Sequence, residues 1–210
     1  MPRIIVSEPI VLAKFADFDM DEIPRKMQSF SEAQYAPDYG SYLHFYENER
    51  SCKAYKSGIE RYIDFIARFE GAVSQDWSVD LSAPIETQIE AIRRNEYSGR
   101  MLEKFGIPHV PNLRFGDRRT YSRCFDGMPR GGTFIVGTHG TTKREDLKLV
   151  ILAGVARAIR ELHPKTLLFY GKVSLDLLDL CKRNGVNVVR YPSQCEIAHE
   201  RALEYRQLLL

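Results

Sequence analysis

Short apolar segments alternate with segments of helical periodicity over most of this chain. Strands that are separated by crossover helices usually pair in parallel and are covered by those helices. The alternation therefore predicts an α/β fold of repeated strand–helix units with a mainly parallel sheet of about six strands. The strands are expected near residues 42–46, 72–75, 109–114, 133–137, 166–170 and 186–190.

The length of the chain limits how such units can close. The 210 residues suit a single domain over 1–210, and neither a linker nor an internal repeat divides them. A complete barrel of eight units needs about 250 residues, so we expect an open or incomplete barrel-like sheet. Residues 1–40 lack the alternation. We expect them to form an irregular segment, with at most a short strand over 4–6, that packs on the repeats of 41–210.

Three Ser/Thr-x-x-Glu sequences predict where helices begin, at Ser57–Glu60, Thr142–Glu145 and Ser193–Glu196. In this capping box the hydroxyl and the carboxylate satisfy backbone N–H groups at the start of a helix. The first box predicts a helix that ends before Gly71, the second a helix to about residue 162, and the third the C-terminal helix.

The composition is that of an ordinary globular protein, with 44% hydrophobic and 28% charged residues. The four cysteines form no CxxC pair, and the N-terminus lacks the apolar run of a signal peptide. No apolar run approaches the roughly 20 residues that span a bilayer. We therefore expect a cytoplasmic protein with free thiols and no membrane partner.

The loop Gly137–Thr142 is the most informative stretch for function. It should follow a buried strand, and ligands of parallel α/β folds bind at the carboxyl ends of strands. Glycines let a backbone approach a ligand, and the start of the next helix favours an anion. Thr138, Gly140 and Thr141 are thus candidate ligand contacts, and His139 is a candidate acid or base. The alternative is a tight turn with an ordinary helix cap.

Asp76 and Trp77 follow another predicted strand. Asp76 is a candidate general base or acceptor for a sugar hydroxyl, and Trp77 could stack on a ring. The alternative is that Trp77 fills the core.

Further polar residues follow the strands near 109–114 and 166–170. Asn112, Arg114 and Asp117 could recognise a charged ligand, with Arg114 holding a carboxylate or phosphate, and Lys172 lies at the same predicted edge. The alternative for Arg114 is an internal ion pair with Asp117.

The region Arg93–Arg130 is basic, with nine basic residues against four acidic ones in a chain whose net charge is only +2. It could bind a phosphate-rich ligand or nucleic acid, or it could be a solvated helix face. No histidine spacing or other motif indicates a metal or a particular cofactor. Cys124 could be a nucleophile, although its apolar spacing favours a buried thiol.

Several motifs occur in an order that resembles the DUF4417 family, a domain of unknown function. They lie at Gly71–Ser78, Ile107–Asp117, Cys124–Pro129, Thr138–Gly140 and Pro164–Gly171. The resemblance implies a protein of bacteria, phages or other mobile elements, and it implies no reaction. The family motifs include the positions of Asp76, Asn112, Arg114, Asp117, Cys124, Asp126, Thr138 and Gly140.

Two functional hypotheses follow. The first is a site for a nucleotide, a sugar phosphate or another anionic small molecule; whether it is catalytic, through Asp76 and His139, stays open. The second is a non-catalytic protein of a phage or plasmid that binds nucleic acid or a host protein through Arg93–Arg130.

Overall fold

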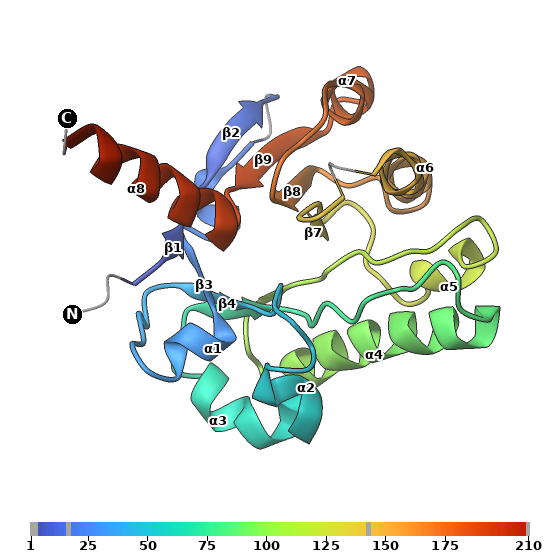
Figure 1. The fold of residues 1–210 in the computed structure, drawn as a ribbon. Helices are drawn as coiled ribbons and strands as arrows, with labels where there is room; N and C mark the ends of the chain where they lie inside the picture. Colours follow the sequence, from blue (N-terminus) through green and yellow to red (C-terminus); the bar gives the residue numbers. More distant parts are fainter. Residues whose placement is uncertain (1–3, 16–17, 142–143, 209–210) are drawn as a thin grey trace.

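The predicted alternation of strands and helices is confirmed in the computed structural model, which describes residues 4–15, 18–141 and 144–208. Figure 1 shows the strands at the centre and the helices around them. One sheet has the strand order β1-β3-β4-β5-β6, and the other has the order β2-β9-β8-β7. The strands are β1 (Val6–Ser7), β2 (Ile10–Ala13), β3 (Met27–Ser29), β4 (Tyr42–His44), β5 (Gly71–Val73), β6 (His109–Val110), β7 (Thr133–Gly137), β8 (Thr166–Tyr170) and β9 (Asn187–Tyr191).

The two sheets form one barrel-like wall. Strands β3 to β6 are parallel to one another, as are β7 to β9, and a parallel bridge between Asn112 and Ile135 links β6 to β7. The N-terminal segment joins the two ends of this row, because β1 pairs antiparallel with β3 and β2 pairs antiparallel with β9. The mainly parallel α/β fold is confirmed, but the described residues form two mixed sheets of five and four strands instead of one sheet of about six.

The N-terminal segment differs from the expectation. Residues 4–40 are not irregular: they supply β1 and β2, and β3 with α1 adds a strand–helix unit before the first predicted one. The strand β3 has no hydrophobic alternation, because Gln28 and Ser29 are polar and yet buried. Gln28 is satisfied by a bond from its amide to the carbonyl of Ala36 (2.8 Å) and by one from the N–H of Asp38 (2.9 Å).

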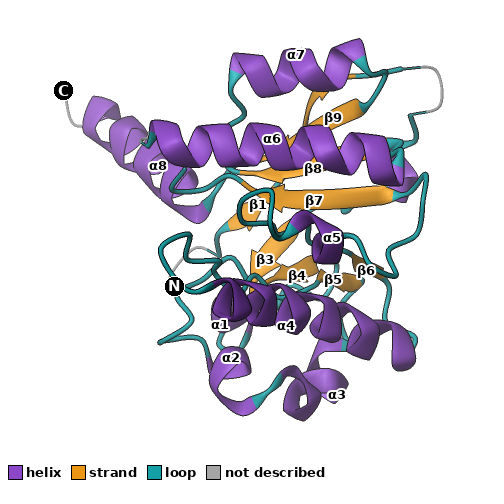
Figure 2. Cartoon of the chain, turned by 90° about the vertical axis from the view of Figure 1, so that its right-hand side faces the viewer, coloured by secondary structure: helices purple, strands orange, loops and turns teal. Residues whose placement is uncertain are grey.

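The helices cover the outside of the wall. Figure 2 shows α6 and α7 beside the second sheet and α4 beside the first. Within the described residues, no helix combines the length and the apolar character needed to cross a membrane. The helices are α1 (Phe30–Ala33), α2 (Lys53–Ser57), α3 (Ile63–Ile66), α4 (Ile85–Lys104), α5 (Tyr121–Cys124), α6 (Glu145–Leu162), α7 (Leu175–Arg183) and α8 (Gln194–Leu208).

The three capping boxes have different outcomes. The third is confirmed: Ser193 Oγ accepts from the N–H of Glu196, and Glu196 Oε2 accepts from the N–H of Ser193. The first is wrong, because Ser57 is the last residue of α2 and Gly58, at φ 83°, makes no side-chain cap before the 3-10 turn Ile59–Tyr62. Thr142 of the second lies outside the described residues.

Side chains from both sheets meet inside the wall. Met27, Val73, Ile135, Leu168 and Val189 are among the buried residues of this inner cluster. The alternate residues of the same strands, such as Ala72 and Phe134, face the helices outside. These buried side chains fill the space between the two sheets.

Candidate functional site

A hollow of about 420 Å³, here called the first hollow, lies at the carboxyl ends of the parallel strands. It brings together Asp76, Arg114 and His139, which are far apart in the sequence and each follow a different strand. Its other lining residues are Tyr46, Glu47, Asn48, Ser51, Ser78, Gly137, Gln194 and Cys195.

Asp76 is held by three neighbours. Its Oδ1 accepts a hydrogen bond of 2.7 Å from Asn112 Nδ2 and lies 3.2 Å from Arg114 Nε. Its backbone N–H donates to Tyr55 Oη over 2.9 Å. The exposed fraction is 13% for the Asp76 side chain and 21% for that of Arg114. This partly buried ion pair lines the hollow, and Asp76 is held in place by its hydrogen bonds with Asn112 and Tyr55.

Asn112 lies beneath the ion pair. It is buried, and its Oδ1 accepts a hydrogen bond of 3.0 Å from Tyr46 Oη. The Tyr46 ring stacks on Tyr170, with centroids 4.4 Å apart. Burial, and then the nearby Asp76 carboxylate, raises the pKa of Tyr46 well above its ordinary value, so the phenol stays a neutral donor.

Gly137 is required by this packing. A Cβ atom at that position would lie 2.8 Å from Cε1 of Tyr46, closer than carbon atoms approach. Deeper in the barrel, burial lowers the pKa of His44 to about 3, so that this imidazole is neutral. Its Nδ1 accepts from the N–H of Tyr46 (3.3 Å). The floor of the first hollow is thus a neutral, hydrogen-bonded layer.

Charges in the first hollow are mixed. Glu47 and Asp76 oppose the single Arg114. Burial raises the pKa of Glu47, although its Oε2 accepts a hydrogen bond of 3.1 Å from the N–H of Ser31. A pair of acids around one guanidinium suits hydroxyl and amide groups better than a multiply charged anion.

A second hollow of about 430 Å³ adjoins the first and shares His139 and Cys195 with it. Its charge is different. Lys172 is exposed and has no ion-pair partner among the described residues, whereas Glu196 is paired with Arg190 over 2.6 Å. This hollow therefore suits an anionic group. Its lining residues are Thr138, His139, Gly140, Lys172, Ser193, Cys195, Glu196 and His199.

The loop before α6 offers fewer backbone donors than its glycines suggested. The N–H groups of Thr138 and His139 both donate to the carbonyl of Tyr170, over 2.9 and 3.1 Å, and that of Thr141 donates to Thr138. The first turn of α6 already contains Glu145 and Asp146. Side chains, above all Lys172, are thus the main groups that an anion could contact.

Four predicted residues lie outside the two hollows. Trp77 packs edge-on against Tyr55, and Asn112 supports Asp76 from below. Asp117 binds Arg119 (2.7 Å), so the alternative pairing of Arg114 with Asp117 is wrong. Thr141 lines a cavity of only about 30 Å³.

The residues of the site that were missed are Cys195 and His199, in the first turns of α8. Gln194 and Cys195 line the first hollow, and Cys195 and His199 line the second. The capping box at Ser193–Glu196 predicted the helix start, but nothing local indicated that Cys195 and His199 would line the two hollows.

The basic region Arg93–Arg130 is interrupted by acidic partners. Five of its nine basic side chains form ion pairs: Arg94, Arg100, Arg114, Arg119 and Arg123. It therefore lacks the uniform positive charge expected of a nucleic-acid face.

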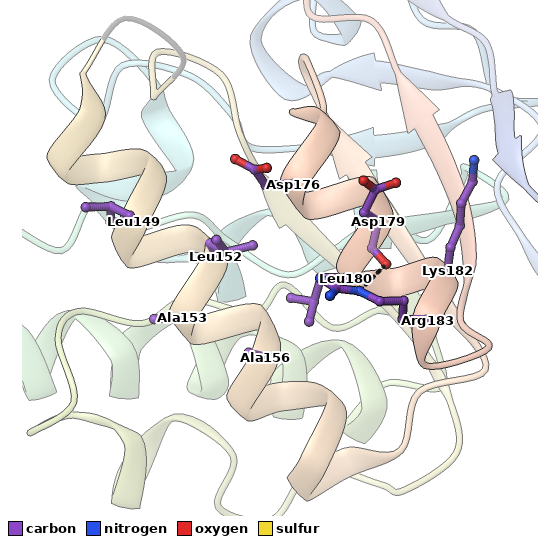
Figure 3. A pocket seen from close by; sticks show the side chains of 9 residues that line it. All are labelled: Leu149, Leu152, Ala153, Ala156, Asp176, Asp179, Leu180, Lys182 and Arg183. Carbon is purple, nitrogen blue, oxygen red and sulfur yellow. Dashed lines mark hydrogen bonds between the residues drawn. The ribbon is translucent and has the colours of Figure 1, made fainter.

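The two hollows together are here called the mouth of the barrel. Two further cavities lie away from it. A groove of about 720 Å³ runs between α6 and α7, where Leu152 and Leu180 point toward each other (Figure 3). A smaller cavity of about 180 Å³ borders α4 and contains Glu96, whose pKa burial raises to about 7. Among the described residues, no cluster of three or more His, Cys, Asp or Glu side chains is placed to hold a metal ion.

These features define a class of protein: a barrel-like α/β protein with a polar mouth at the carboxyl ends of its parallel strands. The match to the family described as "Domain of unknown function (DUF4417)" spans residues 13–191, so the chain belongs to this family. Helix α8 begins beyond the matched region.

Two curated phage proteins are similar to this chain. The "Gene 1 protein" of Mycobacterium phage L5 is 26% identical over 66% of this chain and 61% of its own length. The "Gene 1 protein" of Mycobacterium phage D29 is 24% identical over 67% of this chain and 52% of its own length. The matched part of this chain thus spans less than two thirds of either relative. No solved structure matches the chain.

Proposed function

We propose that this phage-type protein binds a small phosphorylated molecule, of the nucleotide or sugar phosphate class, at the mouth of its barrel. One observation carries the proposal: two hollows of opposite character share His139 and Cys195. The first presents the fixed Asp76–Arg114 pair, and the second presents the unpaired Lys172. A molecule with a hydroxyl-bearing part and a phosphate matches both.

The roles of the side chains follow from their chemistry. The Asp76 carboxylate would accept hydrogen bonds from sugar hydroxyls, and the terminal nitrogens of Arg114 would donate to ring or ester oxygens. Lys172 would bind the phosphate as a point charge, with Thr138 beside it. His139 lines both hollows and would lie between the two parts of the ligand. If the site is catalytic, His139 and Asp76 are its acid–base pair.

Binding of nucleic acid or of a host protein receives less support. Four arginines of Arg93–Arg130 that lie outside the first hollow are paired with carboxylates, and the two adjoining hollows have the scale of a small ligand. We place the action of the protein in the cytoplasm, where the exposed thiol of Cys195 would stay reduced.

A thermal-shift screen of nucleotides and sugar phosphates tests the proposal. At least one should raise the Tm of the wild-type protein by several degrees through mass action. The increase should be lost in Arg114→Ala and in Lys172→Met. It should persist in Arg119→Ala and Lys182→Met, which remove charges outside both hollows. If no compound stabilises the wild type, or if all four variants respond alike, the proposal is wrong.

A further inference from the structure

We infer that α8 determines which ligands the mouth accepts, with Cys195 and His199 as the contacting residues. The inference rests on the proposed function, because it concerns the same two hollows. It adds that the selective wall comes from a helix outside the family-matched residues 13–191. The family domain would form the floor of the two hollows, and α8 would discriminate between ligands.

The start of α8 is fixed firmly against the barrel. The backbone N–H of Gln194 donates to Tyr170 Oη over 3.1 Å, and its Nε2 donates to Ser29 Oγ (2.8 Å) and Glu32 Oε2 (3.2 Å). The reciprocal bonds of Ser193 and Glu196 add a cap. These bonds reach β8, β3 and α1, so the first turn of α8 keeps a defined position over the mouth.

Cys195 and His199 stand one turn apart on the same face of α8. Both line the second hollow, and Cys195 also lines the first. A molecule that crosses from the Asp76–Arg114 pair to Lys172 must therefore pass the Cys195 side chain. The size of that side chain limits the part of the ligand at the junction, and His199 lies beside the part near Lys172.

The rest of α8 leaves the body of the protein. Residues 198–207 are all exposed, and Figures 1 and 2 both show the far end of the helix projecting away from the other helices. Farther along α8, Arg201 Nη2 donates a bond of 3.4 Å to the carbonyl of Ile4, whereas the bonds of Gln194 lie at the start of the helix, beside the two hollows.

Cys195 also provides the test. It is exposed, whereas Cys52, Cys124 and Cys181 are buried, so a thiol reagent such as DTNB should label one residue in the native protein. Adenosine monophosphate or ribose 5-phosphate should slow this labelling several-fold, and inorganic phosphate should slow it less. Cys195→Ser lacks this thiol, so a loss of rapid labelling in that variant would identify Cys195 as the reactive residue.

Two steric variants complete the experiment. Cys195→Trp should abolish the Tm increase or change which probe gives the largest one, and Leu203→Trp, on the exposed part of α8, should change neither. If Arg114-dependent binding occurs without protection of Cys195 and without an effect of Cys195→Trp, the inference is overturned and the proposed function stands. If no probe binds in an Arg114-dependent way, both are overturned. If Cys195→Trp does not fold, protection of the wild-type thiol decides.

Discussion

Asn112 donates a hydrogen bond of 2.7 Å from Nδ2 to Oδ1 of Asp76, the same carboxylate oxygen that lies 3.2 Å from Arg114 Nε. Because Asn112 Oδ1 also accepts from Tyr46, one buried amide orients both an acid and a phenol. The amide is therefore the structural centre of the first hollow, although it does not line it.

Asn112→Ala should lower the free energy of unfolding by about 2 kcal/mol, because Tyr46 Oη and Asp76 Oδ1 would each lose a buried partner. Asn184→Ala, whose amide makes one exposed bond to Leu180, should cost about 0.5 kcal/mol or less. Urea denaturation of both variants measures the difference. Equal losses of unfolding free energy in the two variants would show that the hydrogen bonds of Asn112 stabilise the protein no more than an exposed hydrogen bond does.

Gly137→Ala should destabilise the protein by about 1–3 kcal/mol, because the new methyl group would push Tyr46 off its stack with Tyr170. Gly132→Ala is the matched control: a Cβ there meets Phe134 at an ordinary 3.7 Å. Thermal unfolding should therefore show a clear drop for the first variant and little change for the second. An unchanged Tm in Gly137→Ala would contradict the close approach of Tyr46 to the backbone of Gly137.

The strand positions were predictable because hydrophobic alternation is local. All six expected strands are present, and the rule that ligands bind at carboxyl ends brought Asp76, Arg114 and His139 to one hollow. Strand β3 was not predictable, because its buried Gln28 is satisfied by Ala36 and Asp38 rather than by apolar packing.

Ion-pair partners were not predictable for a different reason. Sequence proximity offered Asp117 as an alternative partner for Arg114, but Asp117 pairs with Arg119, and Arg114 pairs with Asp76 after the neighbouring strand. Likewise, a capping box is a local signal that a neighbouring glycine can override, as Gly58 does after Ser57. Whether α8 lines the two hollows depends on where β9 ends in space, and this position is set by the tertiary fold.

Glu96→Gln should stabilise the protein at pH 8 relative to the wild type by on the order of 1–2 kcal/mol, and by much less at pH 5. Burial raises the pKa of Glu96 from 4.5 to about 7, so the folded state holds a proton that the unfolded state releases. The wild type therefore loses stability as pH rises from about 4.5 through 7.

Glu96→Gln carries no ionisable group at this position, so the variant should not lose stability in this pH range. Urea denaturation at pH 5, 6, 7 and 8 gives the comparison, with Glu90→Gln on the exposed face of the same helix as the control. A difference between Glu96→Gln and the wild type that stays constant with pH would contradict the raised pKa.

Ser193→Ala and Ser174→Ala should each cost about 1 kcal/mol, because each hydroxyl caps a helix. Their effects on the mouth should differ. Loosening the first turn of α8 should change the labelling rate of Cys195 several-fold, whereas loosening α7 should leave it unchanged. Both labelling rates are measured with DTNB below the unfolding transition. A rate that changes only in Ser193→Ala reports the position of α8, and equal changes in both variants would report a general loss of stability.

The central claim is that the mouth recognises a phosphate and a hydroxyl-bearing part separately. Isothermal titration of ribose 5-phosphate and of ribose into the wild type, Lys172→Met and Arg114→Ala tests it most directly. Removing the phosphate should weaken binding to the wild type at least about tenfold, or about 1.4 kcal/mol, and should make much less difference in Lys172→Met. Arg114→Ala should weaken the binding of both compounds. Equal affinity of the wild type for ribose and ribose 5-phosphate, or binding that ignores both substitutions, would contradict the account.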